Sequence, residues 1–134
     1  MSVYKIMKLL VVMWYDENIA SYGDINFKIN SHYCKKHGYD ILKSDKGLLA
    51  DRAPHWERIP LVISKLPDYD YVVWIDADAY FYINGAPLTN IILEHPENDF
   101  ILSYCLTRKA GDYKTGTKNS EINSGIFIVK NTEY

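Results

Sequence analysis

Two carboxylates, Asp76 and Asp78, stand one residue apart directly after the unbroken apolar run of residues 71–75 (Tyr-Val-Val-Trp-Ile). In an extended chain the side chains of residues i and i+2 point to the same side, so both carboxylates can converge on one point. Two close carboxylates repel each other unless a positive charge lies between them. A hard divalent cation that itself holds a diphosphate, Mn²⁺ or Mg²⁺, suits such a pair. The pair therefore predicts a metal site with Asp76 and Asp78 as ligands; the plainer alternative is two carboxylates that face water at a strand end.

The same Asp-x-Asp pattern allows a second chemistry. Phosphatases of the haloacid dehalogenase kind also place it after an apolar strand, and they use the first aspartate, here Asp76, as a nucleophile. Those enzymes usually have threonine two residues after the second aspartate, where this chain has Tyr80. They also usually carry the motif on the first strand of the domain, whereas two candidate strands precede Asp76. Both departures favour the metal site over the phosphatase.

A second group of chemically useful side chains lies in residues 51–60, where a loop leads into a helix. Arg52, His55 and Arg58 bring basic groups to this junction, and both helix N-termini and guanidinium groups bind phosphates. Arg52 is the candidate nucleotide contact, with an ordinary helix-entry residue as the equal alternative. Trp56, in the same segment, is expected to pack in the core.

A third group, Asn123, Ser124 and Gly125, directly precedes the apolar residues 126–129. A glycine that follows small polar residues allows the backbone and short side chains to approach a ligand closely. A simple turn that enters a strand would use the same residue types. The segment is therefore a candidate ligand contact, with the turn as the equal alternative.

The elements that must position these groups follow from apolar periodicity and from stop signals. Strands are predicted at residues 8–15, 39–43, 71–75, 99–105 and 126–129. Helices are predicted at residues 21–37, with Ser21 as the cap and Gly38 as the stop, and at residues 56–66 and 88–94. Polar loops are predicted at residues 44–54 and 107–121, and the second loop carries Arg108, Lys109, Lys114 and Lys118. Those four cations could meet a phosphate or an acceptor, although solvated charges are the commoner case.

The alternation of these strands and helices predicts a single α/β domain over residues 1–134. Because residues 71–75 show no polar alternation, that strand is expected to be covered on both faces, as in a mostly parallel sheet flanked by helices. Ligand sites of open α/β sheets lie at the carboxyl ends of the strands, which is where Asp76 and Asp78 stand.

Composition excludes several classes of protein. The formal net charge of −2 argues against a general electrostatic nucleic-acid binder. Two separated cysteines, Cys34 and Cys105, are too few for a disulfide scaffold and fit a reduced, intracellular setting. The N-terminal apolar run is too short to span a bilayer and lacks the small-residue cleavage pattern of a signal peptide. No membrane anchor is evident, and these features leave the location as cytoplasmic or undetermined.

The groups described above occur in an order that resembles glycosyltransferase family 34, which contains fungal galactosyltransferases and mannosyltransferases and plant xyloglucan xylosyltransferases. The matching stretches cover most of the region between Tyr33 and Asn131. They are residues 33–40 (Tyr-Cys-Lys-Lys-His-Gly-Tyr-Asp), 55–61 (His-Trp-Glu-Arg-Ile-Pro-Leu), 73–78 (Val-Trp-Ile-Asp-Ala-Asp) and 122–131 (Ile-Asn-Ser-Gly-Ile-Phe-Ile-Val-Lys-Asn).

The resemblance implies a GT-A fold, which is Rossmann-like, and a retaining transfer of sugar from a UDP- or GDP-sugar donor to a hydroxyl of a glycan or glycoconjugate. It implies Asp78 as the main ligand of Mn²⁺ or Mg²⁺, with Asp76 at the metal or at the donor ribose. Asn123, Ser124 and Gly125 would line the donor-sugar and acceptor region. With Arg52 included, the expected nucleotide-binding residues are Met13, Trp14, Tyr15, Arg52, Asp76 and Ala77.

Members of this family normally continue well beyond the position of Tyr134, and a downstream histidine completes their metal site. Golgi members also carry a membrane anchor. The sequence is therefore expected to hold the nucleotide-sugar-binding part of a GT-A fold without its C-terminal part. No residue of this sequence can be identified as a catalytic base. A non-catalytic nucleotide-binding fragment is the remaining alternative.

Overall fold

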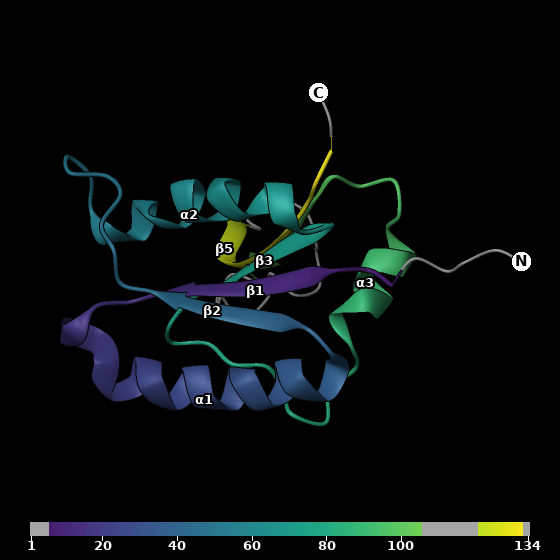
Figure 1. Ribbon diagram of the computed structural model, residues 1–134, viewed down its shortest axis with the longest axis horizontal. Helices are drawn as coiled ribbons and strands as arrows, with labels where there is room; N and C mark the ends of the chain where they lie inside the picture. Colours follow the sequence, from purple (N-terminus) through teal and green to yellow (C-terminus); the bar gives the residue numbers. More distant parts are fainter. Residues whose placement is uncertain (1–5, 106–120, 133–134) are drawn as a thin grey trace, which may run out of the picture.

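The computed structural model describes residues 6–105 and 121–132, which form one five-stranded sheet with helices on both faces (Figure 1). The strand order is β2-β1-β3-β5-β4. The strands are β1 (Leu9–Trp14), β2 (Asp40–Ser44), β3 (Tyr71–Ile75), β4 (Phe100–Cys105) and β5 (Glu121–Lys130). The α-helices are α1 (Ala20–His37), α2 (Arg58–Lys65) and α3 (Leu88–Glu94). Three short 3₁₀ turns complete the set: η1 (Glu17–Ile19), η2 (Pro54–Trp56) and η3 (Leu66–Asp68).

The predicted α/β architecture with a mostly parallel sheet is confirmed. Strands β1, β2 and β3 run parallel, while β5 runs antiparallel to both of its neighbours, β3 and β4. In Figure 1, α1 covers one face of the sheet and α2 the other. Because both faces are covered, β3 is buried along its whole length, as its unbroken apolar run predicts.

Alternate residues of the central strands feed two separate apolar cores. On the α1 side, Val11 and Val73 belong to a cluster that includes Tyr33 and Cys34 of α1. On the α2 side, neighbouring strand residues join Leu61 and Val62 of α2 in a second cluster. This two-sided packing is the reason that neither β1 nor β3 has a polar face.

Helix α1 begins differently from the prediction and ends as predicted. Asp16 accepts a hydrogen bond from the backbone N–H of Asn18 (3.0 Å) and opens the turn η1, which leads directly into α1. Ser21 therefore lies inside the helix, and the prediction that it caps the helix is wrong. At the other end, Gly38 has a φ of 74°, and the N–H of Tyr39 bonds the carbonyl of Cys34 (2.9 Å). This left-handed glycine cap is the predicted stop signal.

Helix α2 is entered through η2 and not at residue 56. Pro60 is the third residue of α2, where its missing N–H leaves no intrahelical bond unmade. Trp56 is 42% exposed, so the expectation that it packs in the core is wrong. The physical reason is the later start of α2: the helix turns Leu61 and Val62 towards the sheet, whereas Trp56 belongs to the preceding turn.

Strand β5 is longer than the predicted residues 126–129, because Asn123, Ser124 and Gly125 are part of the strand and not of a turn before it. The register against β4 shifts between Leu102, which pairs with Phe127, and Ser103, which pairs with Asn123. The two β4 residues are consecutive, but their partners are four positions apart. A bulge in β5 therefore accommodates the extra residues, and bulges of this kind re-aim side chains.

The other predicted elements agree closely with the structure, including the short helix α3 and the strand β4. Most of the predicted basic loop, with Arg108, Lys109, Lys114 and Lys118, lies outside the described residues. Among the described residues, the structure contains no helix with the length and apolar character needed to cross a membrane.

Candidate active site

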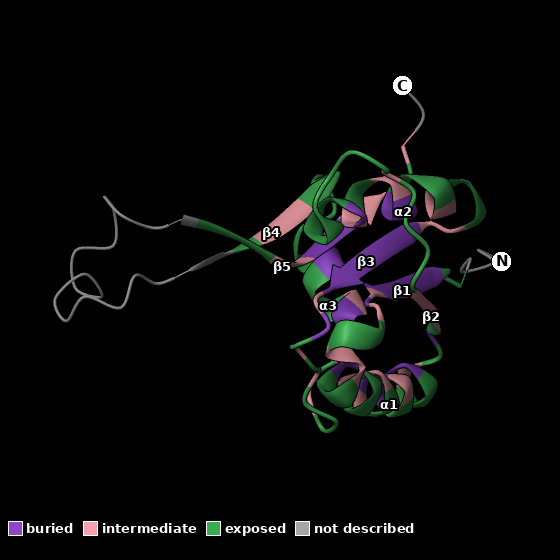
Figure 2. Cartoon of the chain, turned by 90° about the vertical axis from the view of Figure 1, so that its left-hand side faces the viewer, coloured by how far each residue is buried: buried purple, intermediate pink, exposed green. Residues whose placement is uncertain are grey.

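The carboxyl ends of β1 and β3 form one wall of a cavity of about 220 Å³. Trp14 comes from the end of β1, and Asp76, Ala77 and Asp78 follow β3. The opposite walls come from the start of α1 and from the segment that enters α2. Figure 2 shows the molecule from the side on which these strand ends lie. The cavity thus occupies the edge of the sheet at which open α/β sheets bind ligands.

The Asp76 carboxylate is half-buried and held in a fixed orientation. Its Oδ1 accepts a hydrogen bond from Nε1 of Trp74 (2.7 Å) and lies 4.0 Å from Nη1 of Arg58. Burial raises the pKa of Asp76, and the nearby charge of Asp78 adds to this effect. The Trp74 hydrogen bond and the Arg58 charge act in the opposite direction without cancelling it. A carboxylate whose charge is disfavoured in this way gains from a cation placed beside it.

Gly125 of β5 packs directly against Asp76. The backbone N–H of Asp76 donates to the carbonyl of Gly125 (2.8 Å). A Cβ atom at Gly125 would lie 3.2 Å from Oδ2 of Asp76 and 2.9 Å from Oδ1 of Asn123. The Asn123 side chain also accepts a hydrogen bond from the N–H of Gly125 (2.8 Å). The glycine is therefore required for the close approach of β5 to the aspartate pair.

Arg58 joins the three elements that build the site. Its Nη1 donates to both the carbonyl and the Oγ of Ser124 (2.9 and 2.8 Å), and its Nε donates to the carbonyl of His55 (2.6 Å). Its guanidinium carbon lies 5.7 Å from the centre of the Trp74 ring. One side chain from α2 thus fixes Ser124 of β5 and stands beside Asp76 after β3. The sequence pointed to Arg58 as one of three basic residues in its segment, but not as the one beside the carboxylates.

Arg52, the arginine selected from the sequence, lies elsewhere. Its Nε pairs with the carboxylate of Asp51 at 3.9 Å, and both side chains are largely exposed. Its guanidinium carbon lies 5.6 Å from the centre of the Trp56 ring. Arg52 is not one of the residues that line the cavity at Asp76. Its role in nucleotide binding stays a prediction.

Of the three residues expected at the nucleotide base, the structure brings one side chain to the cavity. Trp14 lines it, with its Nε1 bonded to the carbonyl of Lys46 (2.9 Å). Met13 and Tyr15 alternate to the α1 side and are buried. Tyr15 donates to Asp24 (2.7 Å), and burial raises its pKa well above the ordinary tyrosine value. Because side chains alternate along a strand, the three side chains cannot all face one ligand, and the nucleotide-binding roles of Met13 and Tyr15 stay predictions.

Two amides of α1, which the sequence analysis did not single out, hold the turn that carries the aspartates. Asn26 donates to the carbonyl of Ala77 (2.8 Å). Asn30 is fully buried, donates to the carbonyl of Ala79 (3.2 Å) and accepts from the N–H of Phe81 (2.8 Å). The two amides stand four residues apart on one helix face, a spacing that could have marked them as a pair. Their bonds leave Asp78 exposed at the rim of the cavity.

The side-chain oxygen atoms at this site fit a hard divalent cation in part. Asp76 and Asp78 supply carboxylate oxygens, which are the ligands that Mn²⁺ and Mg²⁺ prefer. Within residues 6–105 and 121–132, no cluster of three or more His, Cys, Asp or Glu side chains could hold a metal ion. The described residues therefore offer two protein ligands, and a bound cation would need further oxygen atoms from a ligand or from water.

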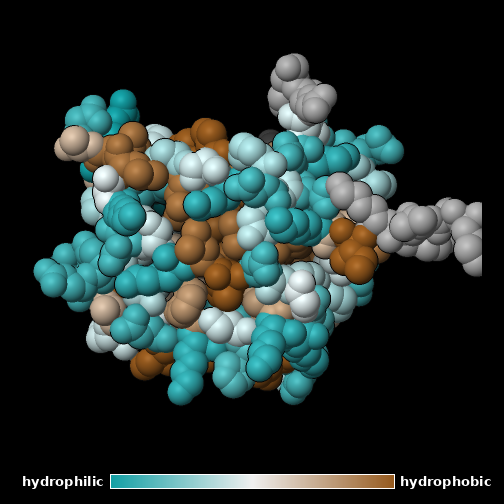
Figure 3. Space-filling view, in the orientation of Figure 1, coloured by the Kyte–Doolittle hydropathy of each residue, from teal (hydrophilic) through white to brown (hydrophobic). Residues whose placement is uncertain are grey.

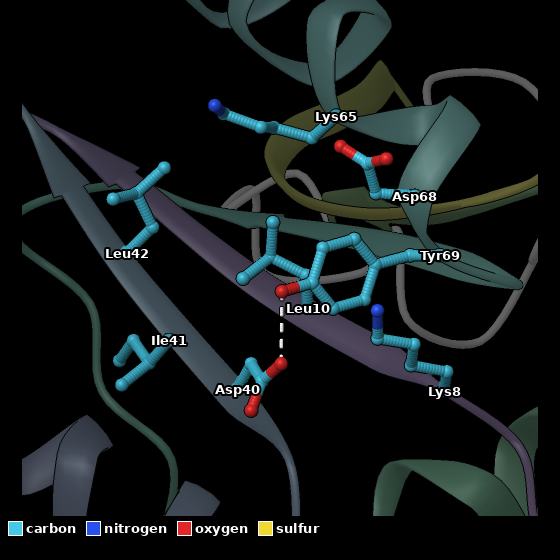
Figure 4. Close-up of a pocket in the computed structure, with 8 residues that line it drawn as sticks. All are labelled: Lys8, Leu10, Asp40, Ile41, Leu42, Lys65, Asp68 and Tyr69. Carbon is cyan, nitrogen blue, oxygen red and sulfur yellow. Dashed lines mark hydrogen bonds between the residues drawn. The ribbon is translucent and has the colours of Figure 1, made fainter.

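A larger cavity, of about 540 Å³, lies at the opposite end of the strands (Figure 4). It is lined by Leu10 near the start of β1 and by Asp40, the first residue of β2. Tyr69 bonds Asp40 across it (2.8 Å), and Lys8 lies over the Tyr69 ring. In Figure 3, which has the orientation of Figure 1, hydrophobic surface is visible between the positions of α2 and β2. The aspartate pair follows the end of β3, so this cavity is separate from the candidate active site.

Comparison with known proteins identifies the class of this fold and site. The chain belongs to the galactosyl transferase GMA12/MNN10 family, whose sequence profile matches residues 8–134. A galactomannan galactosyltransferase of Cyamopsis tetragonoloba is 31% identical over 111 residues, which are 81% of this chain and 24% of that protein. An uncharacterised alpha-1,2-galactosyltransferase of Schizosaccharomyces pombe is 31% identical over 128 residues, covering 75% of this chain and 34% of its own length. Xyloglucan 6-xylosyltransferase 4 of Arabidopsis thaliana is 24% identical over 109 residues, covering 76% of this chain and 19% of that protein.

A solved structure has the same fold. The glycosyltransferase involved in glycosylation of the major capsid of PBCV-1 superposes with a TM-score of 0.68 at 20% identity, over 92% of this chain and 60% of that one. The predicted GT-A class and the resemblance to family 34 are thus confirmed. The chain spans roughly a fifth to a third of the length of the curated relatives it matches. The family assignment favours glycosyl transfer over the phosphatase chemistry.

Proposed function

We propose that this chain is a single donor-binding domain of a metal-dependent glycosyltransferase. Its donor would be a UDP- or GDP-sugar, and its acceptor a hydroxyl of a glycan or glycoconjugate, with retention at the anomeric carbon. The observation that carries the proposal is the convergence of three distant segments on one cavity edge. Asp76 follows β3, and Gly125 belongs to the bulge of β5. Arg58 of α2 donates a hydrogen bond to Ser124, the neighbour of Gly125, and lies 4.0 Å from Asp76.

Each group at this edge has a role in the proposed reaction. Asp76 and Asp78 would hold Mn²⁺ or Mg²⁺, which when bound supplies positive charge to the departing diphosphate. Trp14 presents an indole ring to the cavity, a surface on which a nucleotide base can stack. Asn123, Ser124 and Gly125 would contact the donor sugar attached to that diphosphate, a role supported by the packing of Gly125 against Asp76. Arg58 orients this segment and keeps positive charge near the phosphates.

The names of the relatives bear on the sugar. Two are galactosyltransferases and one is a xylosyltransferase, so transfer of a hexose or a pentose is the corresponding proposal for this chain. The polysaccharides in these names, galactomannan and xyloglucan, are neutral. A neutral glycan acceptor is the matching proposal here.

Isothermal titration calorimetry with UDP and GDP, with and without Mn²⁺, tests the donor site. Mn²⁺-dependent binding is expected for one of the two nucleotides, and Asp78→Ala should abolish that binding. Asp45→Ala is the matched control, because Asp45 is an exposed aspartate paired with Lys43 outside the cavity. Nucleotide binding that ignores Mn²⁺, or that survives Asp78→Ala in a folded protein, would contradict the proposal.

Donor hydrolysis separates an active domain from a binding fragment. The chain should release UDP or GDP slowly from its matching nucleotide-sugar in the presence of Mn²⁺, even without an acceptor. Binding of nucleotide without any hydrolysis or transfer would instead support the alternative of a non-catalytic nucleotide-binding fragment.

A further inference from the structure

A second, apolar groove adjoins the candidate active site. It has a volume of about 360 Å³ and lies between the start of α2 and the face of β4 and β5 that points towards α2. Its walls are formed by Trp56, Ile59, Phe100, Ile122 and Phe127. His55 and Arg58 line both this groove and the cavity at Asp76, so the two are adjacent.

The bulge in β5 creates one wall of this groove. Phe127 faces α2, and strict alternation along the strand would place residues 125 and 123 on the same side. Instead, Ser124 and Ile122 line the groove with Phe127, because the register shift inverts the alternation. The regular pairing with β3, in which Ile126 lies opposite Ile75, brings Gly125 to Asp76, and the bulge against β4 turns Ile122 into the groove.

The groove exposes large apolar side chains on fixed supports. Trp56 is 42% exposed, Phe100 49% and Ile122 72%. The Phe100 and Phe127 rings pack at 5.4 Å between centroids, and the N–H of Trp56 bonds the carbonyl of Ala53 (2.9 Å). Adjacent apolar groups left in water on a rigid frame mark a binding surface.

The charges along the groove favour a neutral occupant. None of the described residues that line it is acidic, and its one permanent cation is Arg58. Arg58 is already engaged by Ser124, by the carbonyl of His55 and by Asp76. An anionic ligand would find no unengaged partner there, and a cation would be repelled.

We infer that this groove is an acceptor subsite, in which the neutral pyranose rings of a glycan stack on Trp56 and Phe100. The inference rests on the proposed function and assigns the side from which the acceptor enters. Pyranose rings present apolar C–H faces that pack against aromatic rings, while their hydroxyls stay at the wet rim. The polar end of the groove, at His55, Ser124 and Arg58, is the end nearest to Asp76. A glycan lying in the groove would therefore bring one end unit to the donor sugar.

Titration of the chain with β-1,4-linked mannohexaose, followed by calorimetry and tryptophan fluorescence, tests the subsite. Trp56→Ala should weaken binding about tenfold or more, whereas Trp56→Phe, which keeps an aromatic face, should stay within about threefold of the parent. Ile63→Ala is the matched control: Ile63 is a 61% exposed apolar residue of α2 that does not line the groove. It should leave affinity unchanged.

The outcomes separate this inference from the proposed function. Equal affinities of Trp56→Ala and the parent for mannohexaose, or no binding of mannohexaose, would overturn the subsite. So would Trp56-dependent binding of octyl glucoside without binding of mannohexaose, which would assign the groove to an alkyl chain. Mn²⁺-dependent binding of UDP or GDP is measured on the same proteins. The Trp56 variants should keep that binding, so failure of the donor site and failure of the subsite give different results.

Discussion

Strands β3 and β5 lie side by side and meet at the same site, yet they contribute to it in opposite ways. Strand β3 is regular and buried on both faces, and it ends directly in the aspartate pair. Strand β5 pairs regularly with β3 from Lys130 to Ile126 and is then broken by a bulge against β4. The regular strand fixes where the carboxylates stand. Strand β5 places Gly125 against Asp76 and, at its bulge, Ser124 within hydrogen-bonding distance of Arg58.

The comparison shows that rigidity and irregularity serve different parts of one site. A strand held by two apolar cores cannot shift its register without exposing a whole set of side chains. A bulge frees a few residues from alternation, so that backbone and side chains can be aimed at a neighbour. Substitutions in β3 are therefore expected to affect stability, and substitutions in the bulge are expected to affect binding.

The largest expected effect is a loss of stability in β3. Val73→Asp places a carboxylate where the exposed fraction is 0%, so it should lower the free energy of unfolding by at least about 3 kcal/mol. Ile122→Asp, in the exposed half of β5, should change it by less than about 0.5 kcal/mol. Urea denaturation followed by circular dichroism measures both. Similar losses in the two variants would break the contrast between the strands.

The second expected effect is a loss of binding in the bulge. Gly125→Ala adds a Cβ at 2.9 Å from Asn123 Oδ1 and 3.2 Å from Asp76 Oδ2, so one of these groups must shift. We expect Mn²⁺-dependent nucleotide affinity to fall by about tenfold or more, because the carboxylate of Asp76, proposed as a metal ligand, would move. Gly47→Ala is the matched control, since its Cβ would meet only one atom, at 3.8 Å. Unchanged affinity in Gly125→Ala would show that the close approach is not needed for binding.

A smaller effect is expected at Arg58, the side chain that connects Ser124 of β5 with Asp76 at the end of β3. Arg58→Ala removes the hydrogen bonds to Ser124 and the positive charge beside Asp76, and it should cost about 1–2 kcal/mol of stability together with part of the nucleotide affinity. Arg58→Lys should keep the charge but not the paired hydrogen bonds. Its stability and nucleotide affinity should therefore lie between those of the parent and those of Arg58→Ala. Arg52→Ala serves as the control and should leave stability unchanged. A larger loss of nucleotide affinity in Arg52→Ala than in Arg58→Ala would restore Arg52 as the phosphate contact.

The smallest expected effect is a pH dependence at the end of β3. Burial raises the pKa of Asp76 in the folded protein. The stabilising contribution of its protonated form is therefore fully present below the ordinary carboxyl pKa, and it is lost as the pH rises through the folded pKa. In EDTA, Asp76→Asn should be slightly more stable than the parent at neutral pH, and this gain should vanish in acid. Urea denaturation across that pH range measures it. A variant less stable than the parent at neutral pH would contradict the raised pKa of Asp76.

Much of the fold could be predicted from local patterns. The apolar run of β3, the glycine stop at Gly38 and the helix α3 all depend on residues close in sequence, and each is found where the sequence places it. The start of α1 could not be predicted in the same way. Ser21 has the right chemistry for a cap, but the turn opened by Asp16 reaches the helix first.

The sequence by itself determined the succession of strands and helices along the chain. It also determined the pair Asp76 and Asp78 at a strand end and the Asn-Ser-Gly segment as a candidate contact. Only the tertiary structure decided that Arg58 and not Arg52 stands beside the carboxylates, and that Trp56 faces a groove instead of the core. The physical reason is that pairing across the sheet, with its bulge, sets which distant side chains meet. Such register depends on contacts between residues far apart in sequence, and local spacing carries no record of it.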